Sequence, residues 1–337
     1  MKNRSRRKRI FLTFVISLIV IACLVLTIFL YSIKKPAKDD SNVIRLGYIK
    51  QAAELPLYVA LENGYFKEQG LTVELVPLGY KEEMDALIRG DIDVIPATSM
   101  SLPFGVEGQE PGLIKIFQPG GIPAEDSEVI EAIITLNDSG IYNLGDLNGR
   151  KVGVSAGATD MFVMKTILKK NGLDVPEDVN VMEMKKETLA IALNAGQVDA
   201  IYMTQPDLAM LMSKINGRYI VKNPRAKYIV APFWSGAGVV ISDYIGKNQQ
   251  KFIRYLDATD KAIDYAEKNP MEAKRILASY TPLDENLTSE VGLYFKAKST
   301  DKIDLTKIQE IADIFYTLGT LNTKINVAEM FYSREKN

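Results

Sequence analysis

The side chains that most often carry enzyme chemistry are nearly absent from this chain. It has no histidine, and its single cysteine, Cys23, lies inside an apolar N-terminal run. Because histidine is the commonest general base and metal ligand, a Ser-His-Asp triad and a His/Cys zinc site are excluded. We therefore expect no enzyme activity, no metal and no cofactor. Carboxylate chemistry alone stays open, with Glu54 and Asp160 as its candidates.

Polar residues that follow short apolar runs are better suited to holding a ligand. Gln51 and Glu54 follow one such run, Thr98 and Ser99 a second, and Gln205 a third. In open α/β sheets, ligands bind beyond the carboxyl ends of the strands, where side chains and backbone amides are free. These five residues are therefore candidate ligand contacts. Glu54 has an alternative role as the cap of the helix that follows it.

A run of small residues, Gly157, Ala158 and Thr159, lies between a predicted strand at 151–154 and a predicted helix at 158–171. Small side chains let a ligand approach the backbone, and the amides and dipole of a helix N-terminus favour an anion. The run lacks the lysine of a P-loop and the spacing of a dinucleotide fingerprint, so it does not indicate a nucleotide. A plain strand-to-helix turn is the alternative.

Two further candidates lie where the chain is expected to cross between lobes. Gln118 precedes one crossing, and Trp234, the only tryptophan, lies in the other. An aromatic wall for a planar or apolar ligand is one role for Trp234, and packing in the core is the other.

A repeated phrase predicts the architecture that positions these residues. Residues 87–95 and 193–201 share the form Leu-x-x-Gly-x-Ile/Val-Asp-Val/Ala-Ile. Each copy ends a helix at glycine and enters an apolar strand. We expect Asp93 and Asp199 to pin these strands rather than to touch a ligand. The repeat predicts two similar lobes with a cleft between them.

Strands and helices alternate over residues 43–239, which predicts an α/β fold with mainly parallel sheets covered by helices. The last hundred residues show mostly helical spacing, including a helix over 284–294. We expect lobe 1 to comprise residues 43–125 and 240–337, and lobe 2 to comprise 126–239.

The N-terminus predicts attachment to a membrane. The first 38 residues hold nine of the 41 Lys and Arg and no acidic residue, so residues 39–337 have a net charge of −10. A basic end at 1–9 precedes an uncharged run at 10–33, about 36 Å long as a helix, and a linker at 34–42. This pattern predicts a transmembrane signal anchor with the bulk of the chain on the extracytoplasmic face. A lipoprotein signal ending at Cys23 is the alternative.

The acidic charge of residues 39–337 also limits the partners. Nucleic-acid binding requires a basic patch or stripe, and the sequence has none outside the N-terminus. We expect a monomer that binds a small-molecule solute and no nucleic acid.

The chain resembles the type II periplasmic binding proteins of the sulfonate, nitrate, taurine and thiamine-precursor group, which serve ABC importers. The resemblance is carried by residues 45–48, 58–66, 69–74, 87–93, 144–154 and 196–200. It implies a discontinuous first lobe, a hinge of two crossings, and ligand contacts at the loops named above. It also implies anion binding by helix N-termini, which agrees with the lack of an obvious arginine clamp. The chain departs from the usual Glu-Pro by having Gln205 before Pro206, which disfavours an amine ligand.

Three functions follow from these observations. The first is capture of a small solute, for example a sulfonate, nitrate or heterocyclic precursor, and its delivery to an ABC permease. The second is a membrane-tethered ligand sensor. The third is a carboxylate-based enzyme on the same fold.

Overall fold

The computed structural model describes residues 42–156 and 158–334. The predicted membrane segment at 10–33, its basic end and nearly all of the linker lie outside the described residues. Within those residues, no helix combines the length and apolar character needed to span a bilayer.

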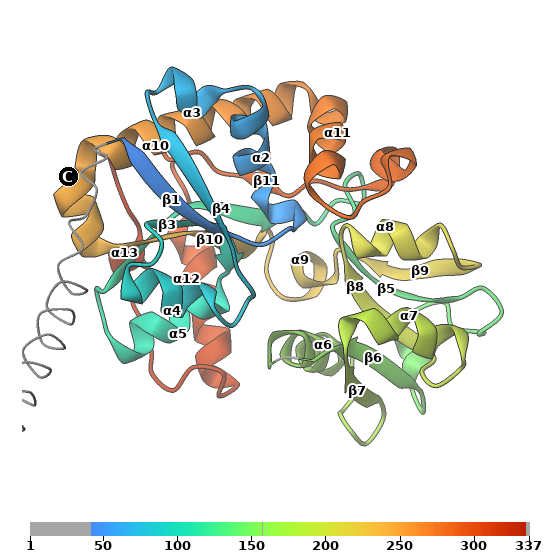
Figure 1. Cartoon of the computed structure of the whole chain (residues 1–337). Coiled ribbons are helices and arrows are strands. Elements are labelled where there is room, and N and C mark those ends of the chain that lie inside the picture. Colours follow the sequence, from blue (N-terminus) through green and yellow to red (C-terminus); the bar gives the residue numbers. More distant parts are fainter. Residues whose placement is uncertain (1–41, 157, 335–337) are drawn as a thin grey trace, which may run out of the picture. The chain divides into compact units, whose positions relative to one another are not determined.

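The described chain forms two lobes, each built on one mixed sheet (Figure 1). In lobe 1 the strand order is β11-β4-β10-β3-β1-β2, and in lobe 2 it is β7-β6-β8-β5-β9. The strands of lobe 1 are β1 (Val43–Tyr48), β2 (Thr72–Pro77), β3 (Val94–Ser99), β4 (Ile114–Ile122), β10 (Phe233–Ile241) and β11 (Phe295–Lys296). Those of lobe 2 are β5 (Glu131–Leu136), β6 (Lys151–Ser155), β7 (Asn180–Met184), β8 (Ala200–Thr204) and β9 (Gly217–Lys222).

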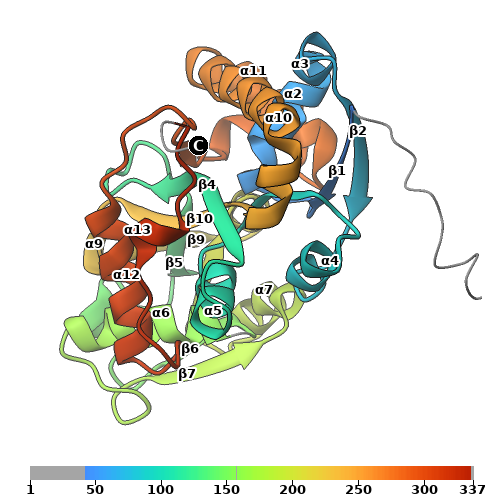
Figure 2. The same ribbon diagram turned by 90° about the vertical axis from the view of Figure 1, so that its left-hand side faces the viewer.

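Helices cover both sheets, and the C-terminal helices return to lobe 1 (Figure 2). Lobe 1 carries η1 (Ala52–Glu54), α2 (Leu55–Glu62), α3 (Tyr65–Glu68), α4 (Glu83–Arg89), α5 (Ser101–Gln109), α10 (Ser242–Lys268), α11 (Pro270–Tyr280), η3 (Glu285–Glu290), α12 (Leu305–Thr317) and α13 (Val327–Met330). Lobe 2 carries η2 (Leu144–Leu147), α6 (Ala158–Lys170), α7 (Lys186–Asn194), α8 (Asp207–Met212) and α9 (Pro224–Tyr228).

The prediction of mainly parallel sheets is wrong. β1 pairs in parallel with β2 and β3, but β10 runs antiparallel to both β3 and β4. Lobe 2 repeats this arrangement, because β6 is parallel to its neighbours and β5 is antiparallel to β8 and β9. The cause is the crossing between lobes. A strand that arrives from the other lobe enters the sheet at the carboxyl ends of the parallel strands. It therefore runs in the direction opposite to theirs.

The repeated phrase has the same structural role in both lobes. Gly90 and Gly196 adopt left-handed backbone conformations (φ 75° and 67°) at the ends of α4 and α7, as a residue that ends a helix requires. The Asp93 carboxylate then accepts a hydrogen bond from the backbone amide of Arg45 at 2.8 Å, and the Asp199 carboxylate accepts one from the backbone amide of Lys151 at 2.8 Å. The prediction that these aspartates pin strands is confirmed.

The predicted helix over 284–294 is wrong. Only Glu285–Glu290 forms a 3-10 helix, and the chain then runs extended into β11. Gly292 passes so close to Val129 that an added Cβ would lie 2.4 Å from its carbonyl oxygen. This segment therefore packs directly on a crossing between the lobes.

Candidate functional site between the lobes

Two chain crossings join the lobes, and one side chain ties them together. The crossings are residues 123–130, between β4 and β5, and residues 223–232, between β9 and β10. The Asn223 amide nitrogen donates to the carbonyls of Glu125 and Glu128, each at 2.8 Å, and its Oδ1 accepts from the Ile130 amide at 2.9 Å. Asn223 therefore holds the two crossings in register.

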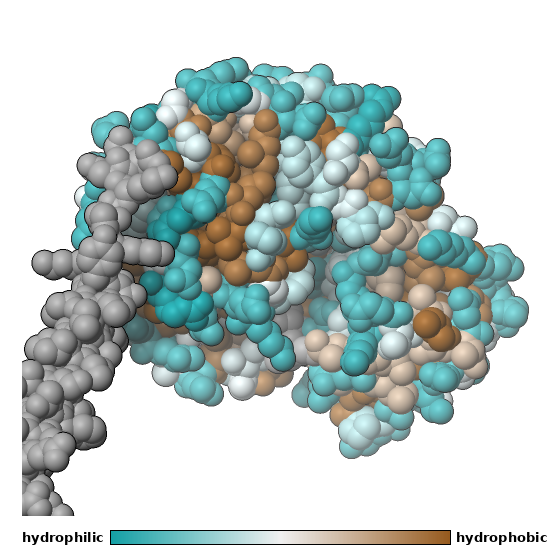
Figure 3. All heavy atoms as spheres, viewed as in Figure 1, coloured by the Kyte–Doolittle hydropathy of each residue, from teal (hydrophilic) through white to brown (hydrophobic). Residues whose placement is uncertain are grey.

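The lobes also touch away from these crossings. Phe162 of α6 packs edge-on against Phe315 of α12, with ring centroids 4.9 Å apart. Phe315 packs in turn on Phe104, at 6.2 Å. A groove of about 1180 Å³ runs between α6 and α12 beside this contact, and Figure 3 shows the surface notched between the two lobes.

The lobe 1 side of the cleft presents a pair of polar side chains from two loops. The Tyr80 hydroxyl donates to the Gln51 Oε1 at 2.7 Å, and the Gln51 Nε2 donates to the Ala97 carbonyl at 3.2 Å. Tyr80 is 54% exposed. Its phenol and the Gln51 amide are therefore held in place while remaining accessible.

The lobe 2 side is organised around a buried ion pair. Arg225 donates to the Glu131 carboxylate through its backbone amide at 2.9 Å and through its Nε at 2.5 Å. Its Nη2 makes the ion pair with Glu131, and the Tyr202 hydroxyl donates to the same carboxylate, both at 2.5 Å. These contacts with Glu131 use the backbone amide, Nε and Nη2 of Arg225, and none of them uses Nη1. Arg225 is thus rigidly held with one donor group outside this pair.

Asp160 lies near this pair, in the first turn of α6. Burial raises its pKa, the charge of Arg225 lowers it, and Glu131 raises it. A hydrogen bond with Ser155 and the charge of Lys186 lower it further. Residues of β6, α6 and α9 therefore meet at one point on the cleft side of lobe 2.

Tyr294 of lobe 1 is electrostatically coupled to this group. Burial raises the pKa of Tyr294 to about 12, the charge of Arg225 opposes this, and the charges of Glu131 and Asp160 add to it. Although 54% of Tyr80 is exposed, desolvation by the surrounding protein raises the pKa of its hydroxyl, with further contributions from Tyr294 and from Asp207 of lobe 2. The polar groups of both lobes therefore converge on the cleft between them.

The predicted ligand contacts divide into two groups. Gln51 and Ser99 are half-buried, with Ser99 3.1 Å from the Ser101 hydroxyl. Ala158 and Thr159 open α6, and Gly157 lies outside the described residues. These positions remain predictions for ligand contact.

The other predicted contacts are buried. The Thr98 hydroxyl donates to Glu83 at 2.7 Å, and the Gln118 amide donates to Thr259 at 2.9 Å and to Asp260 at 2.6 Å. Gln205 donates to the Val129 carbonyl at 3.0 Å and accepts from the Ala209 amide at 3.2 Å. The Gln205 amide therefore binds the crossing, whereas the Thr98 hydroxyl and the Gln118 amide bind partners inside lobe 1.

Trp234 and Glu54 are buried as well. Trp234 packs edge-on against Phe295 with ring centroids 5.2 Å apart, so core packing describes it better than an exposed wall. Glu54 is completely buried and neither of its carboxylate oxygens has a hydrogen-bond partner. It does not act as a side-chain cap of the helix that follows.

Sequence reasoning missed Arg225, Tyr80 and Tyr294. No motif marks them, and each reaches the cleft through tertiary packing.

Two protein-family models match the chain. The model described as NMT1/THI5 like matches residues 123–273, and that of the NMT1-like family matches residues 37–110. A putative binding protein of Brucella abortus is 23% identical over 88% of this chain and 92% of its own length. A putative aliphatic sulfonates-binding protein of Bacillus subtilis is 24% identical over 85% of each chain. A formylaminopyrimidine-binding protein of Halalkalibacterium halodurans is 25% identical over 77% of each.

Solved structures share the fold. The periplasmic aliphatic sulphonate binding protein SsuA from Escherichia coli has a TM-score of 0.72 at 16% identity, over 86% of this chain and 97% of that one. The desulfurization enzyme DSZB has a TM-score of 0.67 at 15% identity, over 87% and 97%. These structural matches confirm the two-lobed fold, and the family-model and sequence matches confirm the resemblance to periplasmic binding proteins.

Proposed function

We propose that this chain is an extracytoplasmic solute-binding protein that captures a small anion between its lobes and delivers it to an ABC importer. The observation that carries this proposal is the Arg225 guanidinium, which Glu131 holds through Nε and Nη2, leaving Nη1 outside this pair, and which is electrostatically coupled to Tyr294 of lobe 1. A guanidinium that is fixed by one carboxylate and offers further donors is well suited to an anionic head group. The N-terminus of α6 adds backbone donors nearby.

Closure of the lobes would complete the site. Gln51 and Tyr80 come from lobe 1, while Arg225 and the start of α6 come from lobe 2. A ligand that contacts both groups favours the closed arrangement, because only that arrangement allows all of its contacts. The relatives named for sulfonates and for formylaminopyrimidine support a small polar ligand with an anionic or strongly accepting group.

The alternative of a carboxylate-based enzyme rests on one observation, the raised pKa of Asp160 at the cleft. The shared fold of DSZB keeps this alternative relevant. Glu54 contributes nothing to it, because its carboxyl is buried inside lobe 1. We favour binding without turnover, since the chain has no histidine and no cysteine outside residue 23.

We further propose that residues 10–33 tether the protein to the cell membrane, with residues 1–9 on the cytoplasmic side. A tethered receptor beside an ABC permease and a tethered sensor that serves no importer both fit this arrangement. Chemical cross-linking of the full-length chain in native membranes separates them, since the first predicts capture of a permease.

Ligand capture is tested on the full-length chain in detergent by following the fluorescence of Trp234, the only tryptophan. The solutes are ethanesulfonate, benzenesulfonate, nitrate and a formylaminopyrimidine. We expect one of them to bind saturably, one per monomer, and to be recovered unchanged. Arg225→Lys keeps the charge beside Glu131 but removes the planar donor fork, so we expect at least tenfold weaker binding. Equal binding by both proteins, or no binding of any solute, would contradict the proposal, and a chemically altered solute would favour the enzyme.

A further inference from the structure

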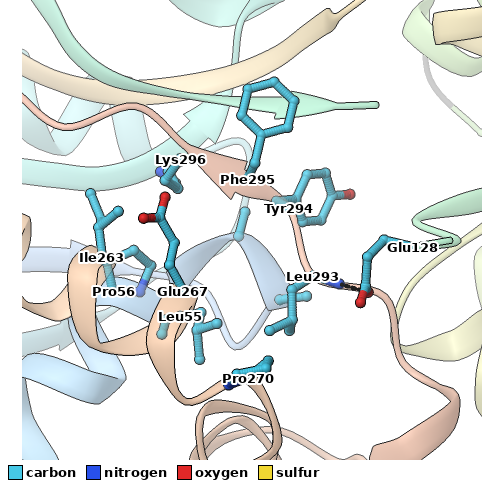
Figure 4. A pocket seen from close by; sticks show the side chains of 13 residues that line it. Leu55, Pro56, Glu128, Ile263, Glu267, Pro270, Leu293, Tyr294, Phe295 and Lys296 are labelled. Carbon is cyan, nitrogen blue, oxygen red and sulfur yellow. Dashed lines mark hydrogen bonds between the residues drawn. The ribbon is translucent and has the colours of Figure 1, made fainter. Parts of the chain in front are cut away.

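A second pocket lies beside the crossings, on the lobe 1 side of residues 293–296. It has a volume of about 180 Å³ and is bounded by the start of α2, the end of α10 and the strand β11 (Figure 4). Leu55, Pro56, Ile263 and Leu293 supply most of its apolar wall. A dry cavity of about 150 Å³ accepts benzene, so this pocket has room for a single ring or a short aliphatic chain.

Lys296 places one amine in this pocket. The residue is 8% exposed, and its stem lies over Gly120 of the neighbouring strand, where an added Cβ would be 3.3 Å from the lysine Cε. Burial lowers the pKa of this amine and the charge of Glu54 raises it, but no hydrogen bond or ion pair with a residue of the described chain holds the amine. Buried ammonium groups are normally paired, so an unpaired one facing a pocket calls for a partner.

Glu54 does not supply that partner. Glu54 and Lys296 both line a separate cavity of about 10 Å³, which is room for about one water molecule, and no ion pair joins them. Burial raises the pKa of Glu54, and burial lowers that of Lys296 to about 8. At neutral pH the lysine therefore keeps its positive charge without a carboxylate in contact.

We propose that this pocket is a binding site for a small apolar monoacid, whose carboxylate pairs with Lys296 and whose body packs against Leu55, Ile263 and Leu293. Glu267 of α10 lies at the rim and turns toward the same part of the pocket as Lys296 in Figure 4. It disfavours a second negative charge on the ligand. The site is separate from the cleft of the proposed function, because Arg225 and Tyr80 do not line it.

The probe is 4-fluorobenzoate, followed by ¹⁹F NMR with the full-length chain in detergent. We expect saturable binding to the native protein and at least tenfold weaker binding of the neutral 4-fluorobenzamide. Lys296→Met removes the charge and should weaken benzoate binding at least tenfold. Lys268→Met removes an exposed lysine from the end of α10 and serves as its matched control.

Two more variants test the location. Ala266→Leu fills the pocket without changing its charge and should abolish binding of both probes. Glu267→Gln should tighten benzoate binding about two- to threefold by removing the rim charge. Unchanged binding in Lys296→Met or Ala266→Leu would overturn the proposal and place the probe in the cleft instead. Neither variant should alter the affinity for nitrate, which has no apolar body for this pocket, and Arg225→Lys should not alter the affinity for 4-fluorobenzoate, so the two proposals fail separately.

Discussion

Glu131 in lobe 2 and Glu54 in lobe 1 are both completely buried, yet their surroundings are opposite. Glu131 accepts hydrogen bonds from the backbone and side chain of Arg225 and from Tyr202. Neither oxygen of Glu54 has a hydrogen-bond partner. Burial raises its pKa and the charge of Lys296 lowers it, although the two groups form no ion pair. Glu83, also in lobe 1, is intermediate, because one oxygen accepts from Thr98 and the other has no partner.

The difference indicates how each lobe uses its polar interior. A fully bonded buried carboxylate fixes its neighbours, so lobe 2 can hold Arg225 rigidly at the cleft. A buried carboxylate without partners costs free energy and makes its surroundings sensitive to protons and ligands. Of these three glutamates, the two in lobe 1 are therefore the ones that we expect to respond to pH, and Glu131 in lobe 2 is the one that fixes a ligand-binding side chain.

The variant with the largest expected effect on this comparison is Glu131→Ala. It leaves Arg225 buried without its counter-charge, so we expect a loss of about 3–5 kcal/mol in the free energy of unfolding, measured by urea denaturation. The double variant Glu131→Ala/Arg225→Met should lose less than the sum of the two single variants, because no unpaired charge remains. A loss below about 1 kcal/mol for Glu131→Ala would show that lobe 2 does not depend on this network.

Glu83→Gln tests the response of lobe 1 to pH. Burial raises the pKa of Glu83 to about 7, against an opposing hydrogen bond from Thr98. Above about pH 4.5 the unfolded chain ionises this group freely, while the folded chain must ionise it in a buried site. The contribution of Glu83 to stability therefore falls as pH rises from about 4.5 to about 7, by on the order of 3 kcal/mol, and is constant above that.

Glutamine still accepts the Thr98 hydroxyl but carries no charge, so the variant should lack this part of the pH dependence. The measurement is the difference in urea stability between native and variant proteins at pH 5 and pH 7.5. If the difference in the free energy of unfolding between the native protein and the variant were the same at both pH values, Glu83 would titrate in the folded protein as it does in the unfolded one.

The sequence predicted the features that depend on local patterns. The glycine turns of the repeat, the strand-pinning roles of Asp93 and Asp199, and the two lobes follow from periodicity and from glycine, which adopts the left-handed conformation without steric cost. The sheet directions did not follow, because β10 and β5 reverse only as a result of the crossings. The side chains of the candidate site were harder to predict than the sheet directions. Arg225 and Tyr294 reach the cleft through contacts between distant segments, and Thr98 and Gln118 turn inward to partners 15 and 141 residues away.

The repeat allows the same substitution at equivalent positions of the two lobes, and this gives the smallest predicted effect. Asp93 pairs with Arg45 at 2.7 Å and its side chain is 9% exposed, whereas Asp199 pairs with Arg150 at 3.3 Å and is 32% exposed. Asp93→Asn should therefore lose about 1.5–3 kcal/mol, the range for a hydrogen bond to a charged group. Asp199→Asn should lose less than about 1 kcal/mol, because water already screens its ion pair.

Urea denaturation of both variants at 0.1 and 1 M salt separates the contribution of the ion pair from that of the backbone hydrogen bond. The effect of Asp199→Asn should vanish at high salt, while most of that of Asp93→Asn should persist. Equal losses in both variants would mean that the shared backbone hydrogen bond, and not the ion pair, sets the contribution of this aspartate.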